Sequence, residues 1–137
     1  MAYEGYLIKF DKTGYIFPLD MIKTETYNIT PRQRQDLDSY RDMDGILHRN
    51  VLEHTASKIE WETKPLLTNK QVAQICENLR ASYENYSERR ISVTYYNPET
   101  DGYDSGTFYM PDATYTPYTA TKEYVKYNQT RYALIEY

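Results

Sequence analysis

The spacing of hydrophobic residues along the chain follows two periods, and each predicts one kind of element. Residues 57–63 alternate, because Ile59 and Trp61 fall on one face and three charged side chains fall on the other. A period of two is typical of a β-strand that is buried on one side. The same reasoning predicts further strands at residues 5–10, 14–19, 22–30, 89–96, 105–111 and 130–137.

A helical period occurs in one stretch, after the strand at 57–63. Apolar residues recur there at positions i, i+3, i+4 and i+7. Thr68 and Gln71 have the spacing of a capping box, in which each side chain bonds the other residue's backbone amide. We therefore predict one amphipathic helix over about residues 69–83 that lays one face on a sheet. Its apolar stripe consists of Val72, Ile75, Cys76 and Leu79.

Two segments between the predicted strands are polar. Residues 31–45 are charged and poor in β-branched residues, and Pro31 cannot continue a central strand because it lacks an amide hydrogen. We predict a polar arm at about residues 29–40. Residues 112–124 are rich in Thr and Tyr, which fits an extended edge, a covering loop or an interface arm.

These elements together predict a single domain over residues 1–137 with an α+β fold. The expected architecture is a mostly antiparallel β-barrel or sandwich with one flanking amphipathic helix. No internal repeat and no Gly/Ser-rich linker divides the sequence.

The stretch YRDMDGILHRNVLEH, residues 40–54, contains the side chains best suited to a metal or acid–base site. Asp44-Gly45 within it is also a hairpin turn signal, because both residues accept positive φ. Such a hairpin places Asp42 and His48 near the turn without requiring that they converge. Neither an H-E-x-x-H motif nor a calcium-loop pattern is present. We interpret the stretch as a hairpin and expect no metal at Asp42, Asp44, His48 and His54.

Other signs of enzyme chemistry are weak. The sequence has no G-x-S-x-G motif, no Gly-rich phosphate loop and no Cys/His pair at nucleophile spacing. Glu25, Glu62 and Asp104 have no sequence feature that would raise a carboxyl pKa, so we assign no general acid. Cys76, the single cysteine, is interpreted as a small core residue. We expect a protein that is not an enzyme and uses no cofactor or small-molecule substrate.

Charge and hydropathy narrow the possible partners. The chain has 16 Lys and Arg against 20 Asp and Glu, mixed along its length, for a net charge of −4. No basic stripe indicates nucleic acid or an anionic membrane. No apolar run is long enough to span a bilayer, and the N-terminal stretch has no secretory signal pattern. We therefore expect synthesis in the cytoplasm, with neither nucleic acid nor membrane as a specific partner.

Tyrosine is unusually common, with 17 Tyr against three Phe and one Trp. Tyrosine combines a large apolar face with a hydroxyl that tolerates water, which suits half-buried strands and wet protein–protein contacts. A general preference for Tyr over Phe in a strand-rich fold explains the same number. Composition leaves both interpretations open.

Three stretches resemble a known group of proteins. They are DGILHRNVLEHTASKIEW, LLTNKQVAQICENL and SVTYYNPETDGYDSGTFYMPD, within roughly residues 44–112. Together with the closing strand, they are similar to a family of short, uncharacterised proteins encoded among the tail genes of prophages in Gram-positive bacteria. The shared patterns are a G-x-L-x-R strand, a Tyr-Tyr strand and a G-x-F-Y-x-P-D strand. These are packing and turn patterns and not catalytic motifs.

The resemblance implies a virion structural protein that is made in the bacterial host cytoplasm and carried in the phage tail. The element order is also similar to the tail-tube and distal-tail fold, in which a β-barrel with one flanking helix assembles into six-fold rings. In that fold a long arm between early strands reaches the neighbouring subunit. Carried onto this chain, the arm is the polar segment at about 29–40. The extra domain of many distal-tail proteins is missing, so tube, distal ring, terminator and connector stay open.

The predicted contact residues follow from this implied assembly. Charges of both signs on the arm suit a head-to-tail neighbour, and tyrosines of residues 112–124 add aromatic area at low entropic cost. We expect a homo-oligomer that also contacts other tail proteins, and the resemblance implies a hexameric ring. A non-viral adaptor domain without catalytic activity and a small ligand-binding barrel are the alternatives. The assigned contact residues are Arg32, Arg34, Asp36, Asp38, Tyr115, Tyr118 and Tyr124.

Overall fold

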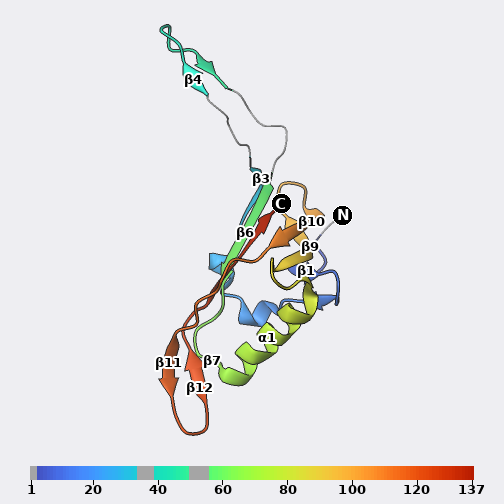
Figure 1. Cartoon of the computed structure of the whole chain (residues 1–137), viewed down its shortest axis with the longest axis vertical. Coiled ribbons are helices and arrows are strands. Elements are labelled where there is room, and N and C mark those ends of the chain that lie inside the picture. The colour runs from blue at the N-terminus through green and yellow to red at the C-terminus, as the bar shows by residue number, and fades with distance from the viewer. Residues whose placement is uncertain (1–2, 34–38, 50–55) are drawn as a thin grey trace.

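The computed structural model describes residues 3–33, 39–49 and 56–137, in which one α-helix flanks a set of antiparallel strands (Figure 1). The helix is α1 (Asn69–Ser82), and two 3₁₀ turns, η1 (Leu19–Met21) and η2 (Thr24–Thr26), lie between β2 and β3. The strands are β1 (Ile8–Phe10), β2 (Tyr15–Ile16), β3 (Asn28–Gln33), β4 (Tyr40–Arg41), β5 (Leu47–His48), β6 (Ala56–Glu62), β7 (Leu67–Thr68), β8 (Tyr83–Asn85), β9 (Arg90–Asn97), β10 (Gly102–Tyr109), β11 (Pro117–Ala120), β12 (Val125–Tyr127) and β13 (Arg131–Glu136).

The largest sheet has the order β2-β1-β9-β10-β13-β6-β3, with β8 paired to β9, and its pairs are antiparallel. The sheet curls, because the hydroxyls of Ser57 on β6 and Tyr95 on β9 lie 3.2 Å apart although two strands separate β6 from β9. Within the described residues no pairing joins β2 to β3, so of the two predicted alternatives, barrel or sandwich, no closed barrel forms and the open sheet fits a sandwich-like arrangement. The mostly antiparallel α+β fold with one helix is confirmed.

The two edges of this sheet explain why it stays open. β2 is two residues long, and β3 contains Pro31 together with a register irregularity between Thr30 and Gln33. A short strand, a proline without an amide hydrogen and an irregular register each hinder pairing with a further strand. The curl therefore brings the edges round the core without a continuous ladder between them.

The boundaries of β3 differ from the predicted ones at both ends. The strand predicted at 22–30 begins only at Asn28, because residues 24–26 form η2. Thr26 holds that turn: its hydroxyl accepts a hydrogen bond from the Glu62 amide (2.8 Å) and donates one to the Lys23 carbonyl (2.6 Å). At the other end β3 runs through Pro31 to Gln33, so the first residues of the predicted arm are strand, with Ile29, Thr30 and Gln33 paired to β6.

The inner side of the curled sheet and α1 enclose a hydrophobic core rich in aromatic rings. The Phe17 ring lies edge-on to Trp61 and Tyr132, with centroid separations of 5.4 and 6.1 Å, and all three residues are buried. Edge-to-face pairs of this kind contribute about 0.5–1.5 kcal/mol beyond simple burial. The predicted inward face of β6 is confirmed, since Ile59 and Trp61 both point into this core. Other fully buried side chains are Ile8, Phe10, Ile22, Ile75, Ile91, Val93, Phe108 and Leu134.

Helix α1 begins and packs as predicted. The Thr68 hydroxyl accepts from the Gln71 amide, and Gln71 Oε1 accepts from the Thr68 amide (2.9 Å), which completes the capping box. Ile75 and Leu79 are buried in the core. Cys76 differs from the prediction because it is only partly buried, with its Sγ 3.3 Å from the Tyr115 hydroxyl. Cys76 lies about 100° round the helix from Ile75, so it falls at the margin of the buried stripe.

Two hairpins lie at opposite ends of the elongated molecule (Figure 1). At one end β4 pairs with β5, beyond the end of β3 and β6. At the other end β11 pairs with β12, and β12 pairs with β7 directly before α1. Of the alternatives for residues 112–124, the extended edge fits β11, which is the edge strand of this three-stranded sheet.

Leu79→Ala should lower the free energy of unfolding by about 2–5 kcal/mol, because it leaves a cavity between α1 and the sheet. Denaturant unfolding followed by circular dichroism measures this loss. Glu77→Ala, on the exposed side of the same helix, is the matched control and should change stability by less than about 0.5 kcal/mol. A loss below about 1 kcal/mol in Leu79→Ala would show that the stripe does not anchor the helix.

Buried tyrosine hydroxyls should make the fold sensitive to alkaline pH. Burial raises the pKa of Tyr27 and of Tyr132, and burial followed by a hydrogen bond to Cys76 raises the pKa of Tyr115 to about 12. In the unfolded chain tyrosine titrates near pH 10. Above roughly pH 10 the unfolded chain therefore binds fewer protons than the folded chain, and the free energy of unfolding falls as the pH rises.

We expect the Tm to decline above roughly pH 10, and to decline less steeply in Tyr132→Phe. Thermal melts across a pH series test this, with tyrosinate absorbance reporting how many hydroxyls have ionised. Identical tyrosine titration curves for the folded and the urea-unfolded protein would contradict the expectation.

Candidate assembly interface

Three of the four charged residues predicted to contact neighbours lie in the sequence between β3 and β6. Arg32 is the exception, because it belongs to β3. Arg34, Asp36 and Asp38 lie outside the described residues, as does His54. The structure therefore describes the foot of the arm up to residue 33 and a hairpin at residues 39–49.

The tyrosines predicted as contacts separate into two groups. Tyr118 is 65% exposed and Tyr124 is 38% exposed, both at the β11–β12 hairpin, where Lys126 Nζ lies 5.2 Å from the Tyr124 ring centroid. Tyr115 is 37% exposed, but its hydroxyl points inward. Its hydroxyl lies 3.3 Å from Cys76 Sγ and 3.2 Å from the Tyr132 hydroxyl. Tyr118 and Tyr124 are thus available for contacts, whereas Tyr115 joins α1 to β13.

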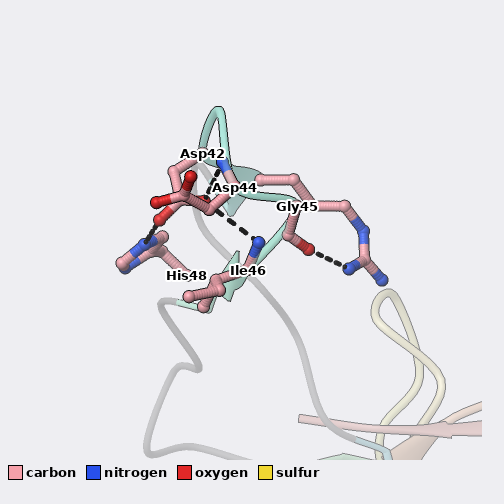
Figure 2. Close-up of polar contacts among 6 residues, drawn as sticks. Asp42, Asp44, Gly45, Ile46 and His48 are labelled. Atoms are coloured by element: carbon pink, nitrogen blue, oxygen red, sulfur yellow. Dashed lines mark hydrogen bonds and ion pairs between the residues drawn. The ribbon is translucent and has the colours of Figure 1, made fainter.

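One carboxylate holds the turn of the β4–β5 hairpin (Figure 2). Asp42 Oδ1 accepts hydrogen bonds from the amides of Asp44 and Ile46, both at 3.0 Å, and Asp42 Oδ2 lies 2.8 Å from His48 Nε2. The backbone closes the same turn, because the Gly45 amide donates to the Asp42 carbonyl and the Asp42 amide donates to the Ile46 carbonyl. Gly45 has φ +81°, a conformation that favours glycine.

The predicted hairpin is confirmed, and the structure adds two details of its geometry. The loop has three residues, Met43, Asp44 and Gly45, with only Gly45 left-handed, because the Asp42 side chain supplies the acceptors that this wider loop needs. Asp42 and His48 do converge, because the register places Tyr40 opposite His48 and brings the imidazole back toward the turn. The hydrogen bond with His48, followed by the Ile46 amide, lowers the pKa of Asp42.

Apolar side chains surround this polar turn. Met43 is fully exposed, and Tyr40, Ile46 and Leu47 are each more than two-fifths exposed. Arg41 Nη1 donates to the Gly45 carbonyl (2.9 Å), and the Tyr40 ring stacks on the His48 ring with centroids 4.9 Å apart. A turn that satisfies its own polar groups and presents clustered apolar side chains has the properties of a protein-docking element.

Among the ionisable groups, the Asp42–His48 pair supports the turn of the hairpin. Within residues 3–33, 39–49 and 56–137, no group of three or more His, Cys, Asp or Glu side chains is placed to hold a metal ion. Of the carboxylates considered as acids, Asp104 Oδ2 accepts a hydrogen bond from the Asn97 side chain (2.7 Å). Glu25 and Glu62 line a polar hollow beside β6.

No helix in the described parts of the chain is long and apolar enough to cross a membrane.

A half-open cavity of about 160 Å³ lies beside α1 and was not anticipated from the sequence. Its walls come from α1 and the β8–β9 turn on one side and from residues 110–132 on the other, so no local pattern marks it. Arg80 of α1 is exposed, and Arg89 pairs with Asp112 (2.7 Å). The lining residues are Cys76, Leu79, Arg80, Tyr83, Tyr86, Arg89, Met110, Pro111, Ala113, Tyr115 and Tyr132.

The Asp42 carboxylate should hold the hairpin turn until the solution is strongly acidic. Because its pKa is lowered on folding, the contribution is present above the ordinary aspartate pKa of about 4 and is lost as the pH falls through the lower, folded value. The Ile46 amide shift in NMR spectra should therefore titrate below that ordinary pKa. Asp42→Asn should abolish this titration. Asp44→Asn should leave it in place, because only the backbone amide of Asp44 takes part in the turn. Equal effects of the two variants would contradict the assignment.

A solved structure shares this fold over nearly the full length of both chains. It covers 99% of this chain and 95% of the matching chain, with a TM-score of 0.54 and 14% sequence identity. That structure is described as the tail of an empty GTA (gene transfer agent) particle, computed with helical refinement under C6 symmetry. At this identity the similarity shows the fold alone, which is a tail-related fold.

Sequence comparison gives a family and no function. No curated protein matches the chain. One family model matches residues 1–137, and its description is a family of unknown function. Because the match spans the whole sequence, the chain belongs to that family of unknown function, DUF6711.

Proposed function

We propose that this protein is a structural component of a phage or prophage tail, where it builds a tube-like or distal ring by self-association and contacts neighbouring tail proteins. The observation that supports this most strongly is the full-length similarity in fold to a chain of a C6-symmetric tail particle. In this proposal the protein is synthesised in the bacterial host cytoplasm and ends in the virion tail.

The shape of the chain suits a ring subunit. A subunit in a ring must contact a neighbour on each side, and the two hairpins lie at opposite ends of the molecule (Figure 1). The edge strand β11 also offers backbone groups with which another chain can pair. Self-association therefore has several possible surfaces and needs no reacting side chain.

The proposed contact residues are the arm and the exposed tyrosines. Tyr118 and Tyr124 supply aromatic area at one hairpin, and the charges of the arm supply complementary pairs at the other end. The arm residues in this proposal are Arg32, Arg34, Asp36 and Asp38. Tyr115 contributes only the part of its ring that is not packed on α1.

The test uses particles released after induction of the strain that encodes the chain. We expect the protein in purified particles, antibody labelling on the tail in negative-stain microscopy, and tailless particles when the gene is deleted. Normal tails that lack the protein would sink the proposal.

A loop replacement tests the arm in the same particles. Residues 31–33 belong to β3, so a deletion that starts there would damage the sheet as well as the arm. Replacing residues 34–48 with a Gly/Ser linker removes the arm after β3 together with the β4–β5 hairpin. We expect this variant to melt like the wild-type protein but to be missing from tails, and normal incorporation would argue against a role for the arm.

A further inference from the structure

We propose that the tip of the β4–β5 hairpin of one copy docks into the cavity beside α1 of a second copy, with Met43 as the inserted side chain. This inference rests on the proposed function, because it names the two surfaces through which copies of the chain would associate.

Met43 has the exposure and chemistry of an anchor. It is fully exposed as the first residue of the three-residue loop, and Ile46, which directly follows the loop, is 58% exposed. The hydrogen bonds of Asp42 hold the loop in one shape before any partner arrives (Figure 2), which reduces the entropy lost on docking. A methionine is flexible enough to fill an irregular cavity, and its sulfur makes favourable contacts with aromatic rings.

The cavity beside α1 has matching properties. Leu79, Met110, Pro111 and Ala113 supply apolar walls, and tyrosine rings supply aromatic ones. Its volume is about 160 Å³, and a cavity of roughly 150 Å³ accommodates a group the size of benzene. One unbranched apolar side chain is therefore a suitable occupant.

Charge complementarity selects a second copy as the partner. Asp42 and Asp44 flank Met43 in the sequence, so the tip carries two acids beside its anchor. Arg80 and Arg89 are among the residues that line the cavity. The Asp42 carboxylate is engaged in the turn, so Asp44 is the acid that would meet Arg80 as the anchor enters. Opposite charges around an apolar contact fix its register and steer its formation.

The arrangement of the chain favours docking between copies over docking within one. The β4–β5 hairpin lies at the far end of the molecule from α1, beyond β3 and β6 (Figure 1). Each copy would give one tip and receive another, which is a head-to-tail contact. Such contacts close into a ring when the rotation between copies permits.

The single native cysteine provides a direct test, because Cys76 lines the cavity. In full-length Met43→Cys protein, a short bismaleimide should join residue 43 of one copy to Cys76 of the next and give a ladder of covalent oligomers. Peptide mapping by mass spectrometry identifies the joined positions. Met43→Cys with Cys76→Ser should lose the ladder, and the wild type should give at most dimers through Cys76. Lys122→Cys, at the tip of the other hairpin, is the matched control and should give no ladder.

Charge reversal tests the same contact without a crosslinker. In this experiment, light scattering measures the self-association of chains that keep the native Met43. Asp44→Arg and Arg80→Asp should each weaken self-association by roughly two- to fivefold, and the double variant should regain most of the loss. Two losses that simply add would contradict a direct contact between these residues.

The crosslinking is repeated in tail particles, which separates this inference from the proposed function. A ladder between residue 43 and Cys76 in particles supports the contact. Particles that contain the protein but give no such crosslink overturn the inference and leave the tail role intact. A crosslink from residue 43 to a different tail protein overturns the choice of a second copy. Absence of the protein from tails contradicts the proposed function, and the purified protein's crosslinks then decide the contact alone.

Discussion

Phe17, Trp61 and Tyr132 pack against one another at the centre of the curled sheet, and most of the fold depends on that contact. Trp61 and Tyr132 are register partners on the neighbouring strands β6 and β13, and the sheet has to curl for Phe17, from the segment after β2, to meet them. Trp61 Nε1 and the Tyr27 hydroxyl are buried without a hydrogen-bond partner in the described part of the chain. An unsatisfied buried donor is unfavourable, so ring packing outweighs hydrogen bonding at this point of the core.

The β4–β5 hairpin is stabilised by contacts that are local in sequence, unlike the rest of the molecule. Its shape depends on one local carboxylate, Asp42, and on partners no more than six positions away in sequence. The body depends on contacts between residues far apart in sequence, such as Thr13 with Ser82 and Ser57 with Tyr95. The shape of the tip is therefore set locally and does not depend on the packing of the body.

Two further features bear on what the surface can contact, namely the Asp42–His48 pair and the cavity beside α1. The Asp42–His48 pair, which has the residue types of a catalytic dyad, supports a turn. The cavity beside α1 has mostly apolar and aromatic walls, with Cys76 at its margin and Tyr115 closing it toward Tyr132. These features suit recognition of another protein surface, and they agree with a fold that also occurs in a particle tail.

The sequence by itself determined the elements whose signals are local. The helix at Asn69–Ser82, its capping box and the alternation of β6 were all predicted, because helix caps and hydrophobic periods depend on neighbours within a few residues. The hairpin at residues 40–48 was predicted for the same reason. Only the tertiary structure decided that the sheet stays open, that β3 continues through Pro31 as an edge strand and that Cys76 borders a cavity. Each of these depends on which segments meet in space, and that is set by packing between residues far apart in the chain, for which a local pattern carries no signal.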